Sequence, residues 1–358
     1  MKIAHLIMEF GLGGIESMLL DILRLQHAAG HHLRLFILHD IYSKEMVDAA
    51  SKYANVVFLH GDSKLIVPFA VLRLNMMLRL FKPDAVHCHN PKFSKYLFYP
   101  KTRVFSSVHG INQNHDSFCS ALGKINRIFA ISDAVRDDLY ARYRYSNIVT
   151  VANGIDLSGI IQRGEFCLVE KLRAVQVSRL EHEKKGQDTL IKAVSILAAE
   201  GFCRDHKFSI DFIGEGPSES YLKQLTDSLG CNEYIHFLGK VPRDRIYQEL
   251  KDYDLIIQPS RNEGFGLSVI EGMAAGLIPV VADHGGPREI VGENGKAGVL
   301  FKCDDAANCA KVLKEIYAMS PQQLNDLQQN AVARSKDYSI EKTCREFECY
   351  YRSAEGSC

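Results

Sequence analysis

The sequence has no apolar stretch long enough to cross a membrane. The longest conspicuous one, Leu65–Leu72, falls well short of the roughly 18 residues that a spanning helix needs. The start of the chain also lacks the pattern of a secretory signal, because Met1–Glu9 reads as a first strand without a long apolar stretch or a small-residue cleavage site. These two absences predict a cytoplasmic protein.

The 10 cysteines include no C-x-x-C pair, and several fall inside predicted strands or helices. This spacing argues against a zinc site and against a disulfide framework, so reduced thiols are expected. Two other candidate metal sites fit poorly. Asp252 and Asp254 resemble a D-x-D motif but lie where a strand begins, and His87 and His89 point the same way from one strand, which gives only two ligands. We therefore predict no metal site.

Two further motifs are missing. The strained G-x-S-x-G turn of many serine hydrolases does not occur. A glycine turn, Phe10–Glu16, follows the first apolar run, but it lacks the full G-x-G-x-x-G spacing, and only Asp40 stands where a dehydrogenase carries its ribose-binding carboxylate. An NAD-dependent dehydrogenase is therefore disfavoured.

The net charge at pH 7 is +0, but it is unevenly divided along the chain. Residues 1–156 contain 18 Lys and Arg against 13 Asp and Glu, and the remainder contains 25 against 30. Two interpretations stay open. In the first, the difference in charge is chance variation between two solvated surfaces. In the second, residues 1–156 bind an anionic partner such as a lipid phosphate or a membrane face.

Short apolar runs alternate with amphipathic stretches along most of the chain, a rhythm that predicts parallel sheets with helices on both faces. The rhythm lapses around residues 157–171 and then resumes, and 358 residues are many for one core, so two domains are expected. The expected strands are Ile3–Ile7, Leu33–His39, Val56–Leu59, Ala85–Cys88, Val104–Val108, Ile128–Ile131, Ile148–Val151, Ala174–Ser178, Ile210–Gly214, Ile235–Leu238, Leu255–Gln258, Ile278–Ala282 and Val299–Phe301.

The predicted fold class is therefore α/β, with two Rossmann-like doubly wound domains that face a central cleft. We expect an acceptor domain over residues 1–157 and a nucleotide-sugar donor domain over residues 158–339. A C-terminal helix, residues 340–356, is expected to pack back on the first domain.

The most informative segment is Pro259–Glu271, in which Glu263 and Glu271 bracket a glycine-rich turn. The turn joins the predicted strand Leu255–Gln258 to a predicted helix, which is where α/β proteins place ligands. The first free amides of that helix can hold a phosphate, while the carboxylates accept hydrogen bonds from hydroxyl groups. A sugar joined to a nucleoside diphosphate carries both kinds of group.

Two cations stand at the start of the second domain. Arg179 follows the strand Ala174–Ser178 directly, and Lys185 precedes a glycine that starts the next helix. Both are placed to reach a diphosphate held by the Glu263 turn. For Lys184 we favour an exposed position in a solvated loop.

Other candidates lie at the ends of other strands. Gly13 and Gly14 are expected to turn their amides toward a phosphate or sugar, although a mere tight turn is the alternative. His109 either faces the cleft or is a buried structural histidine. The turns at Gly214 and Gly239 are expected to line a nucleotide base with their backbone.

Together these residues resemble the retaining glycosyltransferases of family 4, which have the GT-B fold of two Rossmann domains. The resemblance covers nearly the whole chain, and the glutamate pair joined to the Arg and the Lys is specific for the family. The motifs that carry it are Gly13–Glu16, Val108–Gly110, Ile131–Val135, Asn153–Asp156, Ser178–Leu180, Lys185–Gly186, Gly214–Pro217 and Glu263–Glu271.

The resemblance implies a metal-independent hexosyl- or N-acetylhexosaminyltransferase that uses no cofactor and favours a UDP-sugar. Glu271 would bind the ribose, and Glu263 and His109 would lie beside the transferred sugar. Arg179 and Lys185 would neutralise the leaving diphosphate, although the doubled lysine leaves open which of Lys184 and Lys185 contacts it. The amides of Phe265, Gly266 and Leu267 would contact the sugar and the phosphate.

The acceptor is expected to be a glycan or a lipid-linked precursor in surface polysaccharide or lipopolysaccharide assembly, and no nucleic acid is expected to bind. The segment Lys64–Pro83 is apolar with interspersed cations, so it is either a buried helix or one that lies on anionic lipid at the inner membrane face. The competing hypothesis is a protein of the same fold that binds sugar nucleotides or glycans without turnover. A phosphorylase is disfavoured because no lysine stands out as a cofactor anchor.

Overall fold

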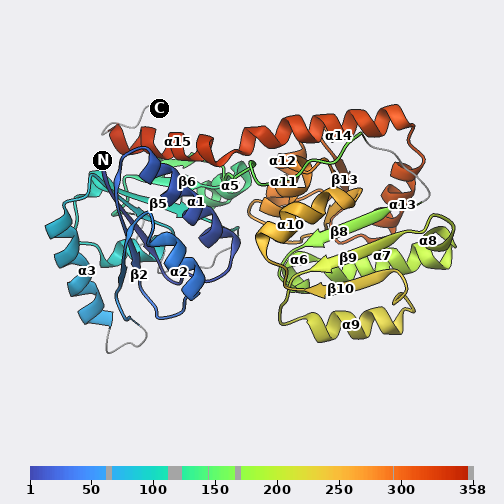
Figure 1. The fold of residues 1–358 in the computed structure, drawn as a ribbon, viewed down its shortest axis with the longest axis horizontal. Coiled ribbons are helices and arrows are strands. Elements are labelled where there is room, and N and C mark those ends of the chain that lie inside the picture. The colour runs from blue at the N-terminus through green and yellow to red at the C-terminus, as the bar shows by residue number, and fades with distance from the viewer. Residues whose placement is uncertain (62–66, 112–122, 144, 166–170, 293, 354–358) are drawn as a thin grey trace. The chain divides into compact units, whose positions relative to one another are not determined.

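The structure is a computed structural model, and it describes residues 1–61, 67–111, 123–143, 145–165, 171–292 and 294–353. The described residues form two compact units, Met1–Asp156 with Ser339–Cys358, and Leu157–Tyr338. We call them unit 1 and unit 2. Each is a parallel sheet covered by helices on both faces (Figure 1), so the predicted α/β class is confirmed.

In unit 1 a sheet of seven strands has the order β3-β2-β1-β4-β5-β6-β7, with every neighbouring pair parallel. The strand order reverses between β1 and β4, which makes this the topological switch point of the unit. The strands are β1 (Lys2–Ile7), β2 (His32–Ile37), β3 (Asn55–Phe58), β4 (Ala85–Cys88), β5 (Val104–Val108), β6 (Arg127–Ala130) and β7 (Ile148–Thr150). The helices are α1 (Gly14–Ala28), α2 (Lys44–Ala50), α3 (Val67–Phe81), η1 (Pro91–Tyr96), η2 (Lys101–Arg103), α5 (Asp133–Tyr143) and α15 (Ile340–Arg352).

In unit 2 a parallel sheet of six strands has the order β10-β9-β8-β11-β12-β13, so the switch point lies between β8 and β11. The strands are β8 (Arg173–Val177), β9 (Ser209–Ile213), β10 (Ile235–Gly239), β11 (Leu255–Gln258), β12 (Ile278–Ala282) and β13 (Val299–Phe301). The helices are α6 (His182–Lys185), α7 (Gln187–Ala199), α8 (Phe202–Asp205), α9 (Glu219–Ser228), α10 (Arg243–Glu249), η3 (Leu250–Asp252), α11 (Leu267–Ala274), α12 (Gly285–Val291), α13 (Ala306–Tyr317), α14 (Pro321–Ser335) and η4 (Lys336–Tyr338).

All thirteen predicted strands form in the described part of the chain, each within two residues of its expected ends. The central strands were recognisable because both of their faces are buried. Every residue of β4, β5, β11 and β12 is buried, so these strands are mainly apolar and do not alternate between apolar and polar residues. The core of each unit is built from these strands and the helices packed on them.

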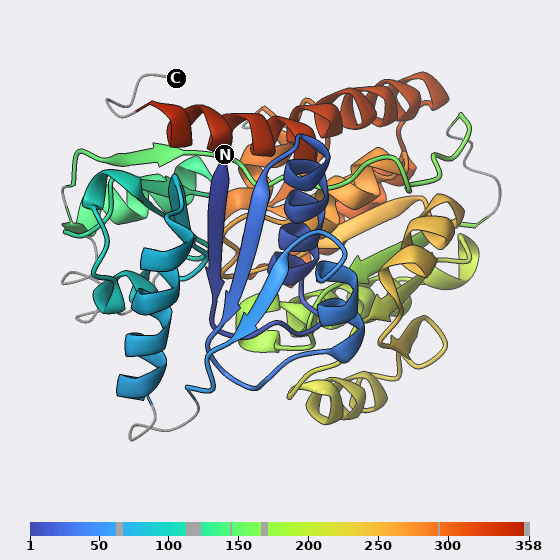
Figure 2. The same ribbon diagram turned by 60° about the vertical axis from the view of Figure 1, so that its left-hand side comes forward.

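The last helix, α15, belongs to unit 1 although the whole of unit 2 precedes it in the chain. Ser339 caps its N-terminus by accepting a hydrogen bond from the amide of Lys342. Its buried residues recur every three or four positions, and Ile340, Phe347 and Tyr351 enter the core of unit 1. The helix α15 packs against α1, the first helix of the unit, and Figure 2 shows that the two helices cross.

The expectation that the cysteines are reduced thiols agrees with the structure at most, but not all, of the described cysteines. Of the cysteines in the described residues, Cys349 in α15 is disulfide-bonded, which corrects that expectation at this position. Spacing along the chain does not reveal which thiols meet in space. The free thiols are Cys88, Cys203, Cys231, Cys303, Cys309 and Cys344.

Among the helices formed by the described residues, none has both the length and the apolar character needed to cross a bilayer.

Candidate functional site

The predicted donor-site residues of unit 2 gather at one edge of its sheet. Arg179 follows β8, Gly214 follows β9, Gly239 ends β10 and Glu263 follows β11. Because all these strands are parallel, their carboxyl ends share one edge, and β8 and β11 flank the switch point. In open α/β sheets, this is the place where ligands bind.

The turn between β11 and α11 carries Glu263 into this edge. The carboxylate accepts hydrogen bonds from Lys185 Nζ and from Gln258 Nε2, the latter at 3.2 Å. Gly266 has a φ of 121°, which side chains rarely allow, and this conformation starts α11 at Leu267. The first amides of α11 have no partner within the helix and point from its N-terminus, where an anion is favoured.

Lys185 reaches the turn from α6, on the other side of the switch point. Gly186, with a φ of 68°, ends α6, and a Cβ at this position would lie 2.0 Å from the carbonyl oxygen of Pro259. Only glycine therefore allows the two loops to approach so closely. The side chains of Lys185 and Glu263 are 21% and 17% exposed, so the ion pair is partly withdrawn from water.

The two neighbouring lysines have different surroundings. Lys184 is exposed and pairs with Glu181 at 2.6 Å, whereas Lys185 faces Glu263. The pKa of Glu181 is lowered, first by the hydrogen bond from Lys184 and also by the charges of Arg179 and Lys185. In the structure, Lys185 is thus the lysine that points to the predicted donor turn.

Arg179 is exposed at the end of β8. No side chain or carbonyl among the described residues accepts a hydrogen bond from its guanidinium, although its own carbonyl oxygen accepts one from Gln187 Nε2 at 2.9 Å. An exposed guanidinium without an acceptor beside a glycine-rich edge is suited to bind phosphate oxygens.

Glu271 lies on α11, and its environment differs from that of Glu263. Tyr247 donates a hydrogen bond from its hydroxyl to Glu271 at 3.2 Å and accepts one from Arg243 Nε at 2.7 Å. The two glutamates are therefore held by different groups. Sequence reasoning missed Tyr247, because no motif links its helix, α10, to α11.

The two glycines predicted to line a base lie together. The amide of Gly214 donates to the carbonyl oxygen of Gly239 at 2.8 Å. Gly214 has a φ of 141°, and a Cβ there would lie 2.0 Å from the carbonyl oxygen of Ser178. The close approach of the loops after β8 and β9 accounts for this glycine without any ligand.

The turn that carries Glu263 is also held from the side of α12. The amide of Gly286 donates to the carbonyl oxygen of Glu263 at 3.1 Å. A Cβ at Gly286 would lie 2.4 Å from Cα of Phe265, so a larger residue would displace the turn. Phe265 itself is buried and packs edge-on against Tyr338 at a centroid separation of 5.6 Å.

In unit 1, Gly13 and Gly14 follow β1 and open α1. The carboxylate of Glu16 folds back so closely that a Cβ at Gly13 would lie 2.3 Å from its oxygen. The pKa of Glu16 is raised, chiefly because the group is buried. A carboxylate at this position repels a phosphate and accepts hydrogen bonds from hydroxyls, so this turn is better suited to a sugar.

His109 follows β5 at the same edge of the unit 1 sheet. Both ring nitrogens are buried, and neither has a hydrogen-bond partner among the residues that the structure describes. Burial lowers the pKa of His109 to about 4, so the ring is neutral at pH 7. A neutral imidazole offers one donor and one acceptor, which matches a sugar hydroxyl.

A third histidine joins the pair His87 and His89, so the predicted count of two possible metal ligands is wrong. His5 on β1 pairs in register with His87 on β4, and ligand atoms of the three histidines lie within 4.8 Å of one another. The sequence could not reveal this, because residues 8–84 separate the two strands.

Hydrogen bonds already occupy most of these ring nitrogens. His5 bonds to His89 at 3.0 Å and to Gln26 at 2.8 Å, and His87 bonds to Tyr351 at 2.6 Å and to Ser107 at 2.8 Å. Burial lowers the pKa of His5 to about 4 and holds the pKa values of His87 and His89 well below their usual range. Neutral imidazoles joined by hydrogen bonds account for the cluster without a metal.

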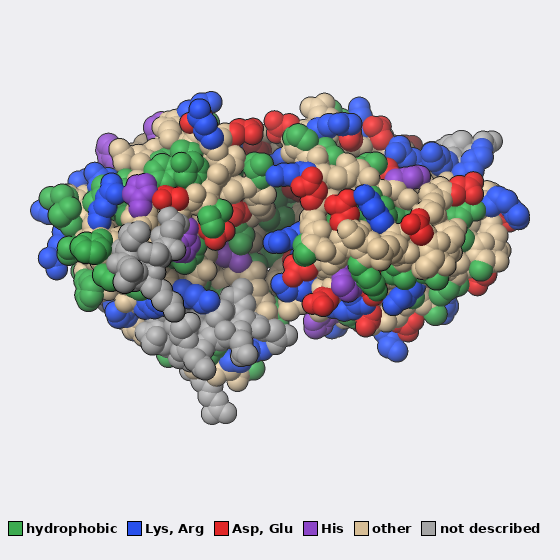
Figure 3. Space-filling view, turned by 90° about the horizontal axis from the view of Figure 1, so that it is seen from below, with side chains coloured by type: hydrophobic (Ala, Val, Ile, Leu, Met, Phe, Trp, Pro, Cys, Tyr) green, Lys and Arg blue, Asp and Glu red, His purple; other side chains and the backbone are tan. Residues whose placement is uncertain are grey.

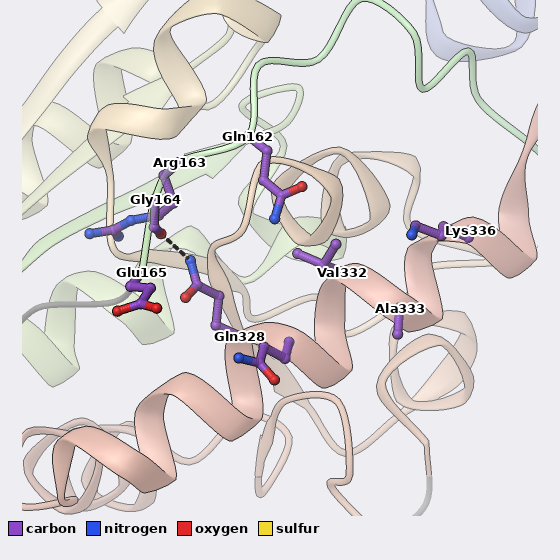
Figure 4. Close-up of a pocket in the computed structure, with 9 residues that line it drawn as sticks. Gln162, Arg163, Gly164, Glu165, Gln328, Val332, Ala333 and Lys336 are labelled. Atoms are coloured by element: carbon purple, nitrogen blue, oxygen red, sulfur yellow. Dashed lines mark hydrogen bonds between the residues drawn. The ribbon is translucent and has the colours of Figure 1, made fainter.

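A cavity of about 340 Å³ lies elsewhere in unit 2, between the segment Gln162–Glu165 and α14. In Figure 4, the side chain of Gln328 reaches the carbonyl oxygen of Gly164, with a separation of 2.8 Å. None of the predicted site residues lines this cavity. It is therefore separate from the candidate donor site.

Comparisons with known proteins agree with this architecture. The family model described as "Glycosyltransferase Family 4" matches residues 12–158, and the one described as "Glycosyl transferases group 1" matches residues 166–334. An uncharacterized glycosyltransferase of Haemophilus influenzae is 25% identical over 229 residues, which are 63% of this chain and 61% of that protein.

The amylovoran biosynthesis glycosyltransferase AmsK of Erwinia amylovora is 32% identical over 152 residues, 41% of this chain and 36% of that protein. The chain thus spans between about a quarter and three fifths of the length of the curated relatives that it matches. The crystal structure of Anabaena Alr3699/HepE in complex with UDP has the same fold, with a TM-score of 0.79, 20% identity, and coverage of 97% of this chain and 98% of that chain.

Proposed function

Because this chain belongs to family 4 of the glycosyltransferases and has the GT-B fold, we propose that it transfers a sugar from a nucleoside diphosphate donor to a glycan or lipid-linked acceptor, with retention at the anomeric carbon. The observation that carries the proposal is the pair of Lys185 and Glu263 beside the N-terminus of α11. A cation, a carboxylate and free helix amides together complement a diphosphate joined to a sugar.

In this proposal, unit 2 holds the donor. Arg179, Lys185 and the first amides of α11 bind the diphosphate and stabilise the charge that it gains as it leaves. Glu263 accepts hydrogen bonds from the hydroxyls of the transferred sugar, and Glu271 accepts them from the ribose. Within unit 1, His109 is proposed to form hydrogen bonds with a sugar hydroxyl as a neutral group, which fits its two ring nitrogens without a described partner.

The proposed transfer needs no covalent intermediate with the protein. The acceptor oxygen forms a bond to the anomeric carbon on the face from which the diphosphate departs, while the bond from that carbon to the diphosphate oxygen breaks. The proton of the acceptor hydroxyl passes to the leaving diphosphate. The cations around the diphosphate therefore stabilise it as it leaves, and they also influence how readily it accepts the proton of the attacking hydroxyl.

We propose a UDP-sugar as the donor, with a hexose or an N-acetylhexosamine as the sugar. The UDP complex of the structurally similar Anabaena protein supports the choice of uridine. We further propose an acceptor in surface polysaccharide or lipopolysaccharide assembly. The support is the similarity to AmsK of Erwinia amylovora, a glycosyltransferase of amylovoran biosynthesis.

Thermal-shift screening with UDP-, GDP- and ADP-sugars tests the proposal. A donor at about 100 times its Kd stabilises the folded state by about 2.7 kcal/mol, which raises the unfolding temperature by several degrees. We expect this rise with UDP-sugars, followed by release of UDP when a suitable acceptor is added. The absence of a rise with all three nucleotide classes would contradict the proposal.

The same measurements separate the alternative, a non-catalytic protein that binds sugar nucleotides or glycans. Such a protein would show the thermal shift but would consume no donor with any acceptor. The two cations beside the donor turn, Arg179 and Lys185, favour catalysis because a diphosphate gains negative charge as it leaves.

We also propose that unit 1 contacts an anionic membrane through α3. One face of α3 carries Phe69, Leu72, Met76 and Leu80, which are 54–74% exposed and recur every three or four residues. The opposite face is buried through Ala70, Leu74, Asn75 and Leu78. Large apolar side chains in this arrangement are unusual on a protein surface that faces only water.

Cations accompany the apolar face. Arg73 and Arg79 are exposed on α3, and Lys82 follows the helix. Figure 3 shows hydrophobic side chains interspersed with Lys and Arg at the end of the molecule where Figure 1 places α3. Anionic lipid satisfies both groups at once, since the apolar residues enter the interface and each cation near the surface contributes about 1 kcal/mol.

Sedimentation with vesicles tests this contact. The protein is expected to sediment with phosphatidylglycerol vesicles at low salt, and Phe69→Ser with Leu72→Ser should release most of it. Leu229→Ser is the matched control, because Leu229 is a 40% exposed apolar residue in unit 2. Equal sedimentation of the α3 variant and the control would exclude α3 as the contact.

A further inference from the structure

Arg261 lies in the turn between β11 and α11, two residues before Glu263, and its side chain turns away from Glu263 toward α7. Its guanidinium donates two hydrogen bonds to the carboxylate of Asp188, at 2.7 Å and 2.9 Å. It also donates to Thr189 Oγ1 at 2.8 Å and to Asp304. The forked contact with Asp188 fixes the orientation of the guanidinium as well as its position.

A second set of contacts joins the same turn to α6. The guanidinium of Arg261 donates to the carbonyl oxygen of His182 at 2.7 Å. The backbone amides of Arg261 and Asn262 both donate to the carbonyl oxygen of Lys184, at 2.8 Å and 3.0 Å. Lys185 directly follows Lys184 in the chain, and Glu263 directly follows Asn262. These hydrogen bonds therefore join the two segments next to the residues of the Lys185–Glu263 pair.

The contact between Arg261 and Asp188 is sheltered, whereas the side chain of Asp304 is 58% exposed. The side chain of Asp188 is 8% exposed and that of Arg261 is 23% exposed. The pKa of Asp188 is lowered although burial alone would raise it, because the charge and hydrogen bonds of Arg261 outweigh burial. A charge-assisted network in such a place is costly to break, since the remaining partner would keep a buried charge.

From this geometry we infer that Arg261 is a positioning residue: it fixes the turn that carries Glu263 to the helix that carries Lys185, so that the two groups meet the donor as one preorganised pair. The inference rests on the proposed function for the role of that pair. Arg261 itself does not touch the donor, because its guanidinium is already occupied by Asp188, Thr189, Asp304 and His182.

Arg261→Gln tests the inference, with Arg163→Gln as the matched control. Arg163 bonds to Asp254 at 2.9 Å with side chains that are 15% and 11% exposed, but it lies at the opposite end of β11. Both variants break a sheltered Arg–Asp pair in unit 2, so both are expected to lower the unfolding temperature. All binding measurements are made well below either unfolding temperature.

The first readout is UDP binding by calorimetry, measured both in the protein that keeps Lys185 and in the Lys185→Ala variant. Arg261→Gln is expected to weaken UDP binding about 10-fold or more, because small displacements of a site cost this much, whereas Arg163→Gln should leave it nearly unchanged. If Arg261 acts through Lys185, the effect of Arg261→Gln should disappear in the Lys185→Ala background. An equal loss in both backgrounds, or an equal loss in the Arg163→Gln control, would overturn the inference.

The second readout needs no ligand. Amide hydrogen exchange of the segment 259–267 is expected to speed up about 10-fold in Arg261→Gln and to stay unchanged in Arg163→Gln, because only the first frees the turn to open locally. Unchanged exchange in Arg261→Gln would overturn the inference. If the unmodified protein binds no UDP, the choice of donor in the proposed function fails, and exchange still decides the role of Arg261.

Discussion

Glu263→Gln is expected to lower the rate constant of sugar transfer by about 100-fold or more, the range found when one preorganised polar group is removed from an active site. The substitution keeps the size of the side chain but removes the negative charge that faces Lys185 and the sugar hydroxyls. Transfer rates with a UDP-sugar at saturating concentration provide the measurement, and donor binding should change much less than the rate constant.

Two other glutamates serve as controls for this result. Glu271→Gln is expected to raise the KM for the donor more than it lowers the rate constant, since Glu271 is proposed to bind the ribose and is held by Tyr247. Glu233→Gln, at an exposed loop position, should change neither. If Glu263→Gln retained the full rate in a folded protein, the proposed contact with the sugar would be wrong.

Lys185→Ala is expected to weaken donor binding by about 10- to 100-fold, because a hydrogen bond between charged groups contributes about 1.5–3 kcal/mol. The loss should be larger for the UDP-sugar than for the isolated sugar, which lacks the diphosphate. Titration calorimetry with the UDP-sugar and with the isolated sugar measures the two losses. The variant also leaves Glu263 without its cation, so the unfolding temperature must be recorded beside the affinity.

The neighbouring lysine supplies a matched control in the same helix. Lys184→Ala removes an equal charge one residue away, but Lys184 is exposed and pairs with Glu181. We expect its effect on UDP affinity to stay within about 2-fold, as for a typical exposed ion pair. Equal losses in the two variants would mean that only the total charge of α6 matters and that Lys185 has no specific place in the site.

The fold was largely predictable because its signals are local. Central strands such as Ala85–Cys88 and Leu255–Gln258 are buried on both faces, so each is a short apolar run that can be recognised without knowledge of its neighbours. The glycine turn after Leu255–Gln258 and the cation after Ala174–Ser178 follow from the same local pattern.

The parts of the site that sequence reasoning missed depend on contacts between distant segments. Nothing near Gly286 indicates that it packs against Phe265, and nothing near Arg261 indicates that it bonds to Asp188. The choice between Lys184 and Lys185 has the same origin, since adjacent residues of one type differ only in the direction that the folded helix gives them. His5 joins His87 only because β1 and β4 are neighbours in the sheet.

The helix α15 has a consequence for the order in which the protein folds during its synthesis. Unit 2 is one continuous stretch, Leu157–Tyr338, and can close its core as soon as that stretch has left the ribosome. Unit 1 begins before unit 2 but lacks Ile340, Phe347 and Tyr351 until the chain has been made past residue 351, so these core contacts are missing in the meantime. Unit 1 therefore starts before unit 2 but is completed after it, and a ribosome that stalls before residue 340 leaves unit 1 with an unfinished core that is prone to aggregation while unit 2 has already folded.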